Sequence, residues 1–126
     1  MIWLDSSYVI ARLLGEPRAA FEVPAGPVFV LPAQLAECHV YFKKAEINTS
    51  IVTATLEALP IHHSSFAETT LASRLYIDAR RAQSKASLAD ALLAAAVHAK
   101  NGRLLTFDDD FSSLGMKRDG ELWLPK

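Results

Sequence analysis

The sequence lacks several features that would place it in common classes of protein. It contains a single cysteine, Cys38, so no disulfide can form within the chain. Its 13 basic and 14 acidic side chains nearly cancel, so binding to nucleic acid or to a membrane would depend on local patches of charge. No basic segment followed by a long apolar stretch and a cleavage site opens the chain. We therefore expect a protein of the cytoplasm.

Long apolar runs are also missing. The most apolar segment, residues 88–99, is only about a dozen residues long and contains Asp90, so it predicts a buried helix and no membrane span. The sequence shows no internal repeat, no low-complexity segment and no linker between domains. With 126 residues and 51% hydrophobic content, the chain is long enough for one core and too short for two. We therefore predict a single domain over residues 1–126.

Short apolar runs alternate with helical patterns along the chain. Such runs are typical of strands that are buried in a parallel sheet, and the alternation predicts an α/β domain with right-handed crossovers. In the helix after residue 64, Phe66 and Leu71 are expected to face inward. Strands are predicted at residues 2–4, 28–31, 61–63, 104–107 and 122–124, and helices at residues 6–14, 32–46, 48–59, 65–82 and 88–100. The strands at 2–4 and 104–107 should be central neighbours, because they are the most apolar and both continue into acids.

Four acidic residues are expected to meet at one edge of this sheet. Asp5 and Asp108 directly follow the two central strands. Glu37 and Asp90 lie within the first two turns of predicted helices. Because the carboxyl ends of parallel strands and the amino ends of the following helices share an edge, where α/β sheets bind ligands, the four carboxylates should converge.

Each acid also has a simpler explanation. Asp5 can cap the helix that follows it. Ser87 and Asp90 have the spacing of a capping box, although a lone aspartate in so apolar a helix would be costly unless it were paired or bound to a metal. Glu37 would by default be a solvated helix residue. These readings compete with the convergent site, and only the joint placement of the acids favours the site.

A cluster of carboxylates in a partly dry site must take up protons or hold a cation. Oxygen ligands select Mg²⁺ or Mn²⁺, and such ions can activate water for phosphodiester hydrolysis. Ser6 and Thr106 each lie beside an acid and could position water or contact the ligands. Whether Asp108 or Asp110 is the fourth ligand stays open, and the remaining aspartates should cap the next turn or face water.

Several cations are candidates for binding the phosphates of a nucleic acid, although a solvated charged face is the simpler explanation. They lie just before Asp90 or one to two turns beyond the acidic edge. The candidates are Arg12, Lys43, Arg80, Arg81 and Lys85.

The motifs together resemble the PIN-domain ribonucleases, and the size of the chain resembles the VapC toxins of toxin–antitoxin pairs. The resemblance rests on Ile2-x-Leu4-Asp5-Ser6-Ser7, Leu35-Ala36-Glu37, Leu88-Ala89-Asp90-Ala91 and Leu105-Thr106-Phe107-Asp108-Asp109-Asp110-Phe111. It implies a PIN-like three-layer α/β/α fold with a central parallel sheet of four to five strands. It also implies RNA cleavage that depends on Mg²⁺ or Mn²⁺, with Asp5, Glu37, Asp90 and Asp108 as the acidic set, and with a homodimer and a small antitoxin as partners.

The leading hypothesis is thus a metal-dependent endoribonuclease, the toxin of a toxin–antitoxin pair. A receiver-like domain that accepts a phosphoryl group on aspartate is an alternative, but the third predicted strand ends in His62-His63-Ser64 where a phosphoacceptor would be needed. A catalytically silent PIN-like module that binds RNA or protein is another. Trp123, near the end of the chain, is a candidate contact for a partner.

Overall fold

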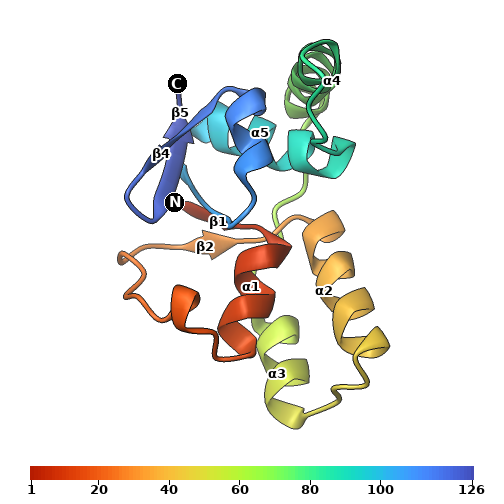
Figure 1. Ribbon diagram of the computed structural model, residues 1–126, viewed down its shortest axis with the longest axis vertical. Coiled ribbons are helices and arrows are strands. Elements are labelled where there is room, and N and C mark those ends of the chain that lie inside the picture. The colour runs from red at the N-terminus through yellow and green to blue at the C-terminus, as the bar shows by residue number, and fades with distance from the viewer.

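A computed structural model describes residues 1–126 as a five-stranded sheet with helices on both faces (Figure 1). This arrangement confirms the predicted α/β/α layers. The strands are β1 (Ile2–Leu4), β2 (Val28–Phe29), β3 (Arg103–Leu105), β4 (Met116–Asp119) and β5 (Leu122–Pro125). The helices are α1 (Ser6–Leu13), α2 (Pro32–Lys44), α3 (Ser50–Ala58), α4 (Phe66–Arg81) and α5 (Leu88–Lys100), and two short 3₁₀ helices are η1 (Pro17–Ala19) and η2 (Asp109–Leu114).

The parallel core of the sheet is the part that positions the acids. The strand order is β2-β1-β3-β5-β4, and β1 runs parallel to both β2 and β3. Leu4 lies opposite Leu105, so the two strands end side by side as predicted. All three residues of β1 are buried, which explains why the strand shows as a continuous apolar run.

The other half of the sheet differs from the expectation. Strand β5 pairs antiparallel with β3, and β4, which we did not predict, pairs antiparallel with β5. Residues 117–119 of β4 are exposed and charged, as is common in edge strands, so no apolar run marks them. The strand expected at residues 61–63 is reduced to one bridge between Val30 and Ile61.

The sheet separates two hydrophobic cores because successive side chains of a strand point to opposite faces. Trp3 and Leu104 pack under α4 and α5, whereas Leu4 and Leu105 pack under α1, α2 and α3. Figure 1 shows these two groups of helices on either side of β1 and β2. The acidic edge therefore lies where the two halves of the molecule meet.

Helix boundaries follow local signals closely, but one predicted cap and the predicted exposure of two aromatic residues were wrong. Thr49, and not Asn48, caps α3 through its side chain. Phe66, expected to face inward, is 89% exposed because it is the first residue of α4 and points away from the core. Trp123 is only 4% exposed and belongs to the core under α4 and α5, so it is not a contact for a partner. None of the helices is long and apolar enough to span a membrane.

Candidate active site

Asp5 is the buried centre of the acidic edge. It follows β1 directly and is 4% exposed. Its Oδ2 accepts hydrogen bonds from Thr106 Oγ1 at 2.7 Å and from Ser7 Oγ at 2.9 Å. Its side chain makes no capping bond to α1, so capping does not explain this residue. Burial raises the pKa of Asp5, the two hydroxyls partly lower it, and the charge of Asp90 raises it further.

The two hydroxyls belong to a network that ties the start of α1 to the end of β3. Ser7 and Thr106 lie 3.2 Å apart through their oxygens. The amide of Phe107 donates to Ser7 Oγ, and the amide of Asp108 donates to Thr106 Oγ1. Thr106 was predicted as a helper and lies next to Asp5. Ser7 was missed, because nothing in the sequence separates it from its neighbour Ser6.

Ser6 serves a different acid. Its hydroxyl donates to Glu37 Oε1 at 3.4 Å, which links α1 to α2. Glu37 lies on the exposed side of α2, as a solvated helix residue would. Its pKa is nevertheless raised, first by partial desolvation and then by the charges of Asp5 and Asp90. Glu37 therefore belongs electrostatically to the acidic edge.

Asp90 has the capping role considered for it. It closes a capping box at the start of α5, where the amide of Ser87 donates to its Oδ2 at 3.0 Å and its own amide donates to Ser87 Oγ at 3.0 Å. Its charge also raises the pKa of Asp5, Glu37 and Asp108. The capping box fixes this carboxylate at the amino end of a buried helix.

Asp108 caps η2, since its Oδ1 accepts the amide of Asp110 at 2.9 Å. Partial burial raises the pKa of Asp108; the amide of Asp110 lowers it, and the charges of Asp110 and Asp90 raise it. Asp109 is exposed. The charge of Asp90 raises the pKa of Asp108, and the charge of Asp108 raises the pKa of Glu37. Asp108 is therefore the better candidate for the fourth acid, with Asp110 beside it.

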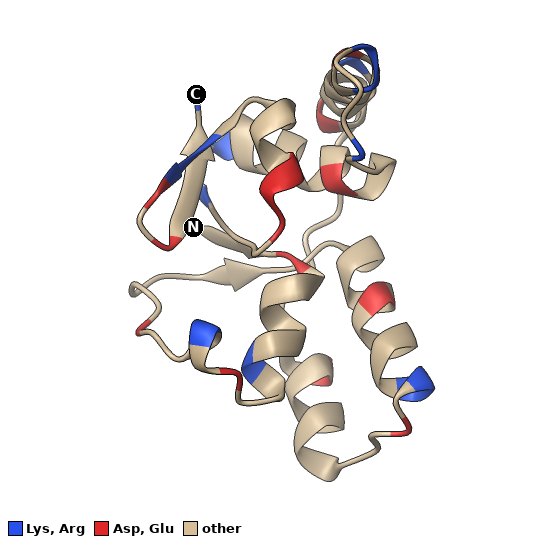
Figure 2. Ribbon diagram, viewed as in Figure 1, with Lys and Arg blue, Asp and Glu red and all other residues tan.

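The four acids thus come from four separate segments, and Figure 2 shows acidic ribbon segments just before α1, on α2, near the start of α5 and around the start of η2. No three His, Cys, Asp or Glu side chains form a ready-made ligand group for a metal ion. The donor set nevertheless fits a hard divalent cation, because it contains only carboxylate oxygens and the charge of Asp90 raises the pKa of the other three acids. Hydrogen bonds engage Asp5 Oδ2, Glu37 Oε1, Asp90 Oδ2 and Asp108 Oδ1, one oxygen of each carboxylate.

Cys38 lies one residue beyond Glu37 on α2 and is buried, as expected for a small hydrophobic side chain. Burial, together with the charges of Asp5 and Glu37, raises the pKa of its thiol to about 12. A thiol with so high a pKa stays protonated at neutral pH, so Cys38 is no nucleophile.

The predicted cations differ in how available they are. Arg12 donates to the carbonyls of Ala19 and Phe21, so its guanidinium holds the loop after α1. Arg80 donates to Ser84 O and lies over the ring of Tyr76. The other three, Lys43, Arg81 and Lys85, are exposed and make no ion pair or side-chain hydrogen bond.

Arg18 is a cation that sequence reasoning missed. It lies on η1, and its guanidinium carbon is 4.5 Å from the centroid of the Phe107 ring. Phe107 stands between Thr106 and Asp108, so this stack places Arg18 at the rim of the acidic edge. Glu16 pairs with Arg18 Nε at 2.9 Å, and no bond engages the two terminal nitrogens. The contact joins segments far apart in the chain, and no local pattern signals it.

Sequence reasoning also missed an ion pair between His62, just before α4, and Glu68 on α4. His62 Nε2 and Glu68 Oε1 are 2.6 Å apart, and Glu68 is buried. Burial raises the pKa of Glu68, but the hydrogen bonds from His62 and Ser65 outweigh it, so the pKa lies below its ordinary value. The ring of His62 packs edge-on against Trp3. This pair ties α4 to the sheet and has a structural role.

Comparison with known proteins supports the fold. A family model for the PIN domain matches residues 2–117. Among solved structures, a toxin–antitoxin complex from Klebsiella pneumoniae is similar with a TM-score of 0.70 and 21% identity, covering 89% of this chain and 91% of that one. The Mycobacterium tuberculosis toxin VapC20, described as cleaving the sarcin–ricin loop, has a TM-score of 0.68 and 19% identity, with 91% and 95% covered. FitAcB from Neisseria gonorrhoeae has a TM-score of 0.61 and 16% identity, with 90% and 93% covered. No curated protein sequence matches the chain significantly.

Proposed function

This chain belongs to the PIN-domain family, and we propose that it is a metal-dependent endoribonuclease, the toxin of a toxin–antitoxin pair. The observation that carries the proposal is the coupling of the four acids at one sheet edge: they come from four segments of the chain, and the charge of Asp90 raises the pKa of Asp5, Glu37 and Asp108. Such a cluster opposes folding when all its members are ionised, so a cation or a proton has to balance it.

The cation would be Mg²⁺ or Mn²⁺, held by Asp5, Glu37, Asp90 and Asp108, with Asp110 able to assist Asp108. Bound there, it would activate water and stabilise charge on the phosphodiester. The protein contributes orientation: Ser7 and Thr106 hold Asp5, and the capping box holds Asp90. Glu37 is the exposed acid of the set, so water reaches the site on its side.

RNA would reach this edge past the exposed cations. Arg18, stacked on Phe107, has two unengaged guanidinium nitrogens and is the best candidate for a phosphate contact. Lys43, Arg81 and Lys85 would add nonspecific attraction. Arg12 is a weaker candidate, because its guanidinium already binds two carbonyls.

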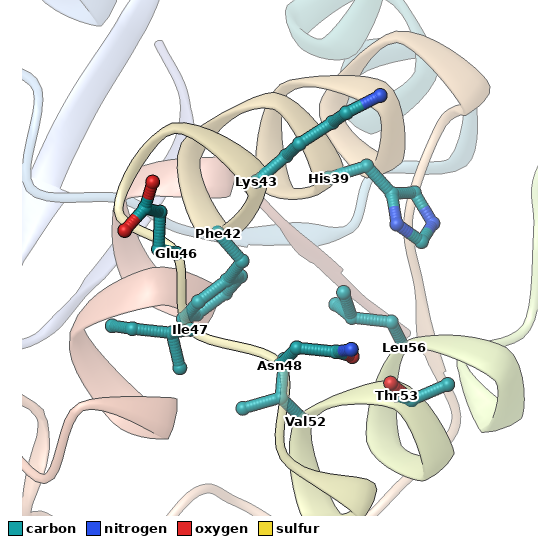
Figure 3. A pocket seen from close by; sticks show the side chains of 9 residues that line it. All are labelled: His39, Phe42, Lys43, Glu46, Ile47, Asn48, Val52, Thr53 and Leu56. Atoms are coloured by element: carbon teal, nitrogen blue, oxygen red, sulfur yellow. The ribbon is translucent and has the colours of Figure 1, made fainter.

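A cavity between two helices supports the proposal of an antitoxin partner. A cavity of about 430 Å³ lies between α2 and α3, and its walls combine apolar and charged side chains (Figure 3). Phe42, Ile47 and Leu56 contribute apolar side chains to the walls of the cavity, and Lys43 and Glu46 contribute charged ones. We propose that a segment of the antitoxin occupies this cavity and extends along α2 toward Glu37. Exposed apolar side chains on α2 and α3, such as Val40 and Ile51, would serve the same contact or a homodimer.

The test compares wild type with Asp90→Asn. Asparagine keeps an oxygen for the Ser87 amide, so the capping box and the fold should survive. Wild type should cleave RNA with Mg²⁺ or Mn²⁺ and not with EDTA, and the ion should raise the melting temperature by mass action. Asp90→Asn should lose both effects, whereas Asp78→Asn, an exposed change on α4, should keep both.

If Asp90→Asn still cleaves RNA with Mg²⁺, the proposed site is wrong. If wild type binds the ion but cleaves no RNA, the chain is a silent PIN-like module, which would act by binding RNA or protein. For the partner, co-expression with the product of the adjacent gene should inhibit cleavage, and Thr53→Arg, at an exposed position that lines the cavity, should relieve that inhibition.

A further inference from the structure

Gln34 is a buried polar residue that the proposed mechanism does not use. It lies on the first turns of α2, one turn before Glu37, and is 0% exposed. Its Nε2 donates to the carbonyl oxygen of Ala89 at 3.2 Å. Only the amide nitrogen can donate to a carbonyl, so this contact also fixes the orientation of the amide.

The bond of Gln34 crosses the seam between the two halves of the molecule. Helix α2 packs mainly on α1, and α5 packs mainly on α4, in different hydrophobic cores. The contact from Gln34 to Ala89 is the one side-chain hydrogen bond between α2 and α5. These are the two helices that carry Glu37 and Asp90, and Ala89 immediately precedes Asp90. The bond therefore joins the supports of two acids that repel each other.

The second polar atom of Gln34 argues against a role in stability alone. Its Oε1 is buried and has no hydrogen-bond partner. A buried acceptor without a partner destabilises a fold, and an apolar side chain of the same size would avoid that cost. Gln34 therefore costs folding free energy at its Oε1, while its Nε2 bridges the two helices that carry Glu37 and Asp90. A role in the acidic site explains why a glutamine stands at this position better than a role in stability does.

We propose that Gln34 is a positioning residue: by tying α2 to the first turn of α5, it sets the separation of Glu37 and Asp90 for binding a divalent cation. This rests on the proposed function, because it assigns Gln34 to the same acidic site. Residues that orient ligands through hydrogen bonds typically change metal affinity about tenfold or more when they are replaced. Gln34 itself would not touch the ion or the RNA.

The experiment measures Mn²⁺ affinity by calorimetry, without RNA, in wild type, Gln34→Met and Gln34→Leu. Both variants replace the glutamine by an apolar side chain of similar volume and so remove the amide that donates to Ala89. The dissociation constant for Mn²⁺ should rise about tenfold. The melting temperature of the metal-free protein should stay the same or rise, since the unpartnered Oε1 is removed. Leu35→Met, a neighbouring change on α2 without a polar contact, is the matched control and should leave the affinity unchanged.

A second readout separates positioning from simple packing. With saturating Mn²⁺, the Gln34 variants should cleave RNA with a lower kcat and an unchanged KM, because the RNA contacts remain. Unchanged Mn²⁺ affinity in both variants would overturn the proposal, and so would an affinity loss that is matched by a lower melting temperature. If wild type binds no Mn²⁺, both the proposed function and the role of Gln34 are wrong. If wild type binds Mn²⁺ and cleaves RNA, the variants test the role of Gln34 alone.

Discussion

Thr106 and Asp5 are separated by 101 positions in the chain, yet Thr106 Oγ1 donates to Asp5 Oδ2 at 2.7 Å. The bond exists because β1 and β3 are parallel neighbours whose carboxyl ends stop side by side. It gives a buried carboxylate one of its two hydroxyl donors, and the other, from Ser7, touches both residues. The acidic edge therefore depends on the register of two short strands.

Replacing Thr106 with valine tests this bond with little change in shape. We expect Thr106→Val to destabilise the protein at neutral pH by about 1.5–3 kcal/mol, the usual value of a hydrogen bond to a charged group. Losing a donor raises the pKa of Asp5 further. The loss should therefore shrink at acidic pH, where Asp5 is protonated. Urea unfolding across pH measures this, with the exposed Thr53→Val as the control; equal losses at all pH values would contradict it.

Asp5 itself should oppose folding of the metal-free protein. Its folded-state pKa lies above the ordinary 3.8, so its favourable contribution exists below that value and is lost as pH rises through the folded-state pKa. Asp5→Asn cannot ionise, and we expect it to be more stable than wild type at neutral pH, because it removes the cost of a buried charge. The gain should vanish at low pH, and activity should be lost. Exposed Asp109→Asn should show neither effect; a destabilised Asp5→Asn would refute the idea of charge strain.

Glu68 should have the opposite pH dependence. Its pKa is lowered below the ordinary 4.5, so the pair with His62 stabilises the fold above that value and loses its effect as pH falls through the lower folded-state pKa. Glu68→Gln should cost about 1–3 kcal/mol at neutral pH, because a buried partner of His62 is weakened. The difference should narrow in acid, and kcat should not change. Exposed Glu57→Gln is the control for chemical denaturation, and a change in kcat at constant KM would place the pair in catalysis instead.

Arg18 should contribute to binding RNA and not to the chemical step. Arg18→Ala should raise KM several-fold with kcat unchanged, and the slope of log affinity against log salt should fall by about 0.7, as for one lost contact to a single-stranded phosphate. Arg118→Ala is the matched control, because Arg118 also lies over an aromatic ring, that of Trp123, but on β4. Equal effects of the two changes would show that Arg18 has no special place.

Much of the acidic edge could be predicted because its signals are local. Short apolar runs that end in Asp5 and Asp108 define strands and their final acids. The spacing of Ser87 and Asp90 sets a capping box within one helical turn, which needs no distant partner. The topology of parallel strands then brings these acids to one edge.

What the sequence determined by itself, then, is the helices, the two central parallel strands and the acids at their ends, because periodicity and capping act over a few residues. Only the tertiary structure decided the long-range choices: Ser7 over Ser6 at Asp5, Arg18 on Phe107, and Gln34 across to Ala89. Those contacts depend on the packing of two cores against one sheet. A sequence shows which side chains can donate or accept, but the register and the angle of the helices decide which of them meet.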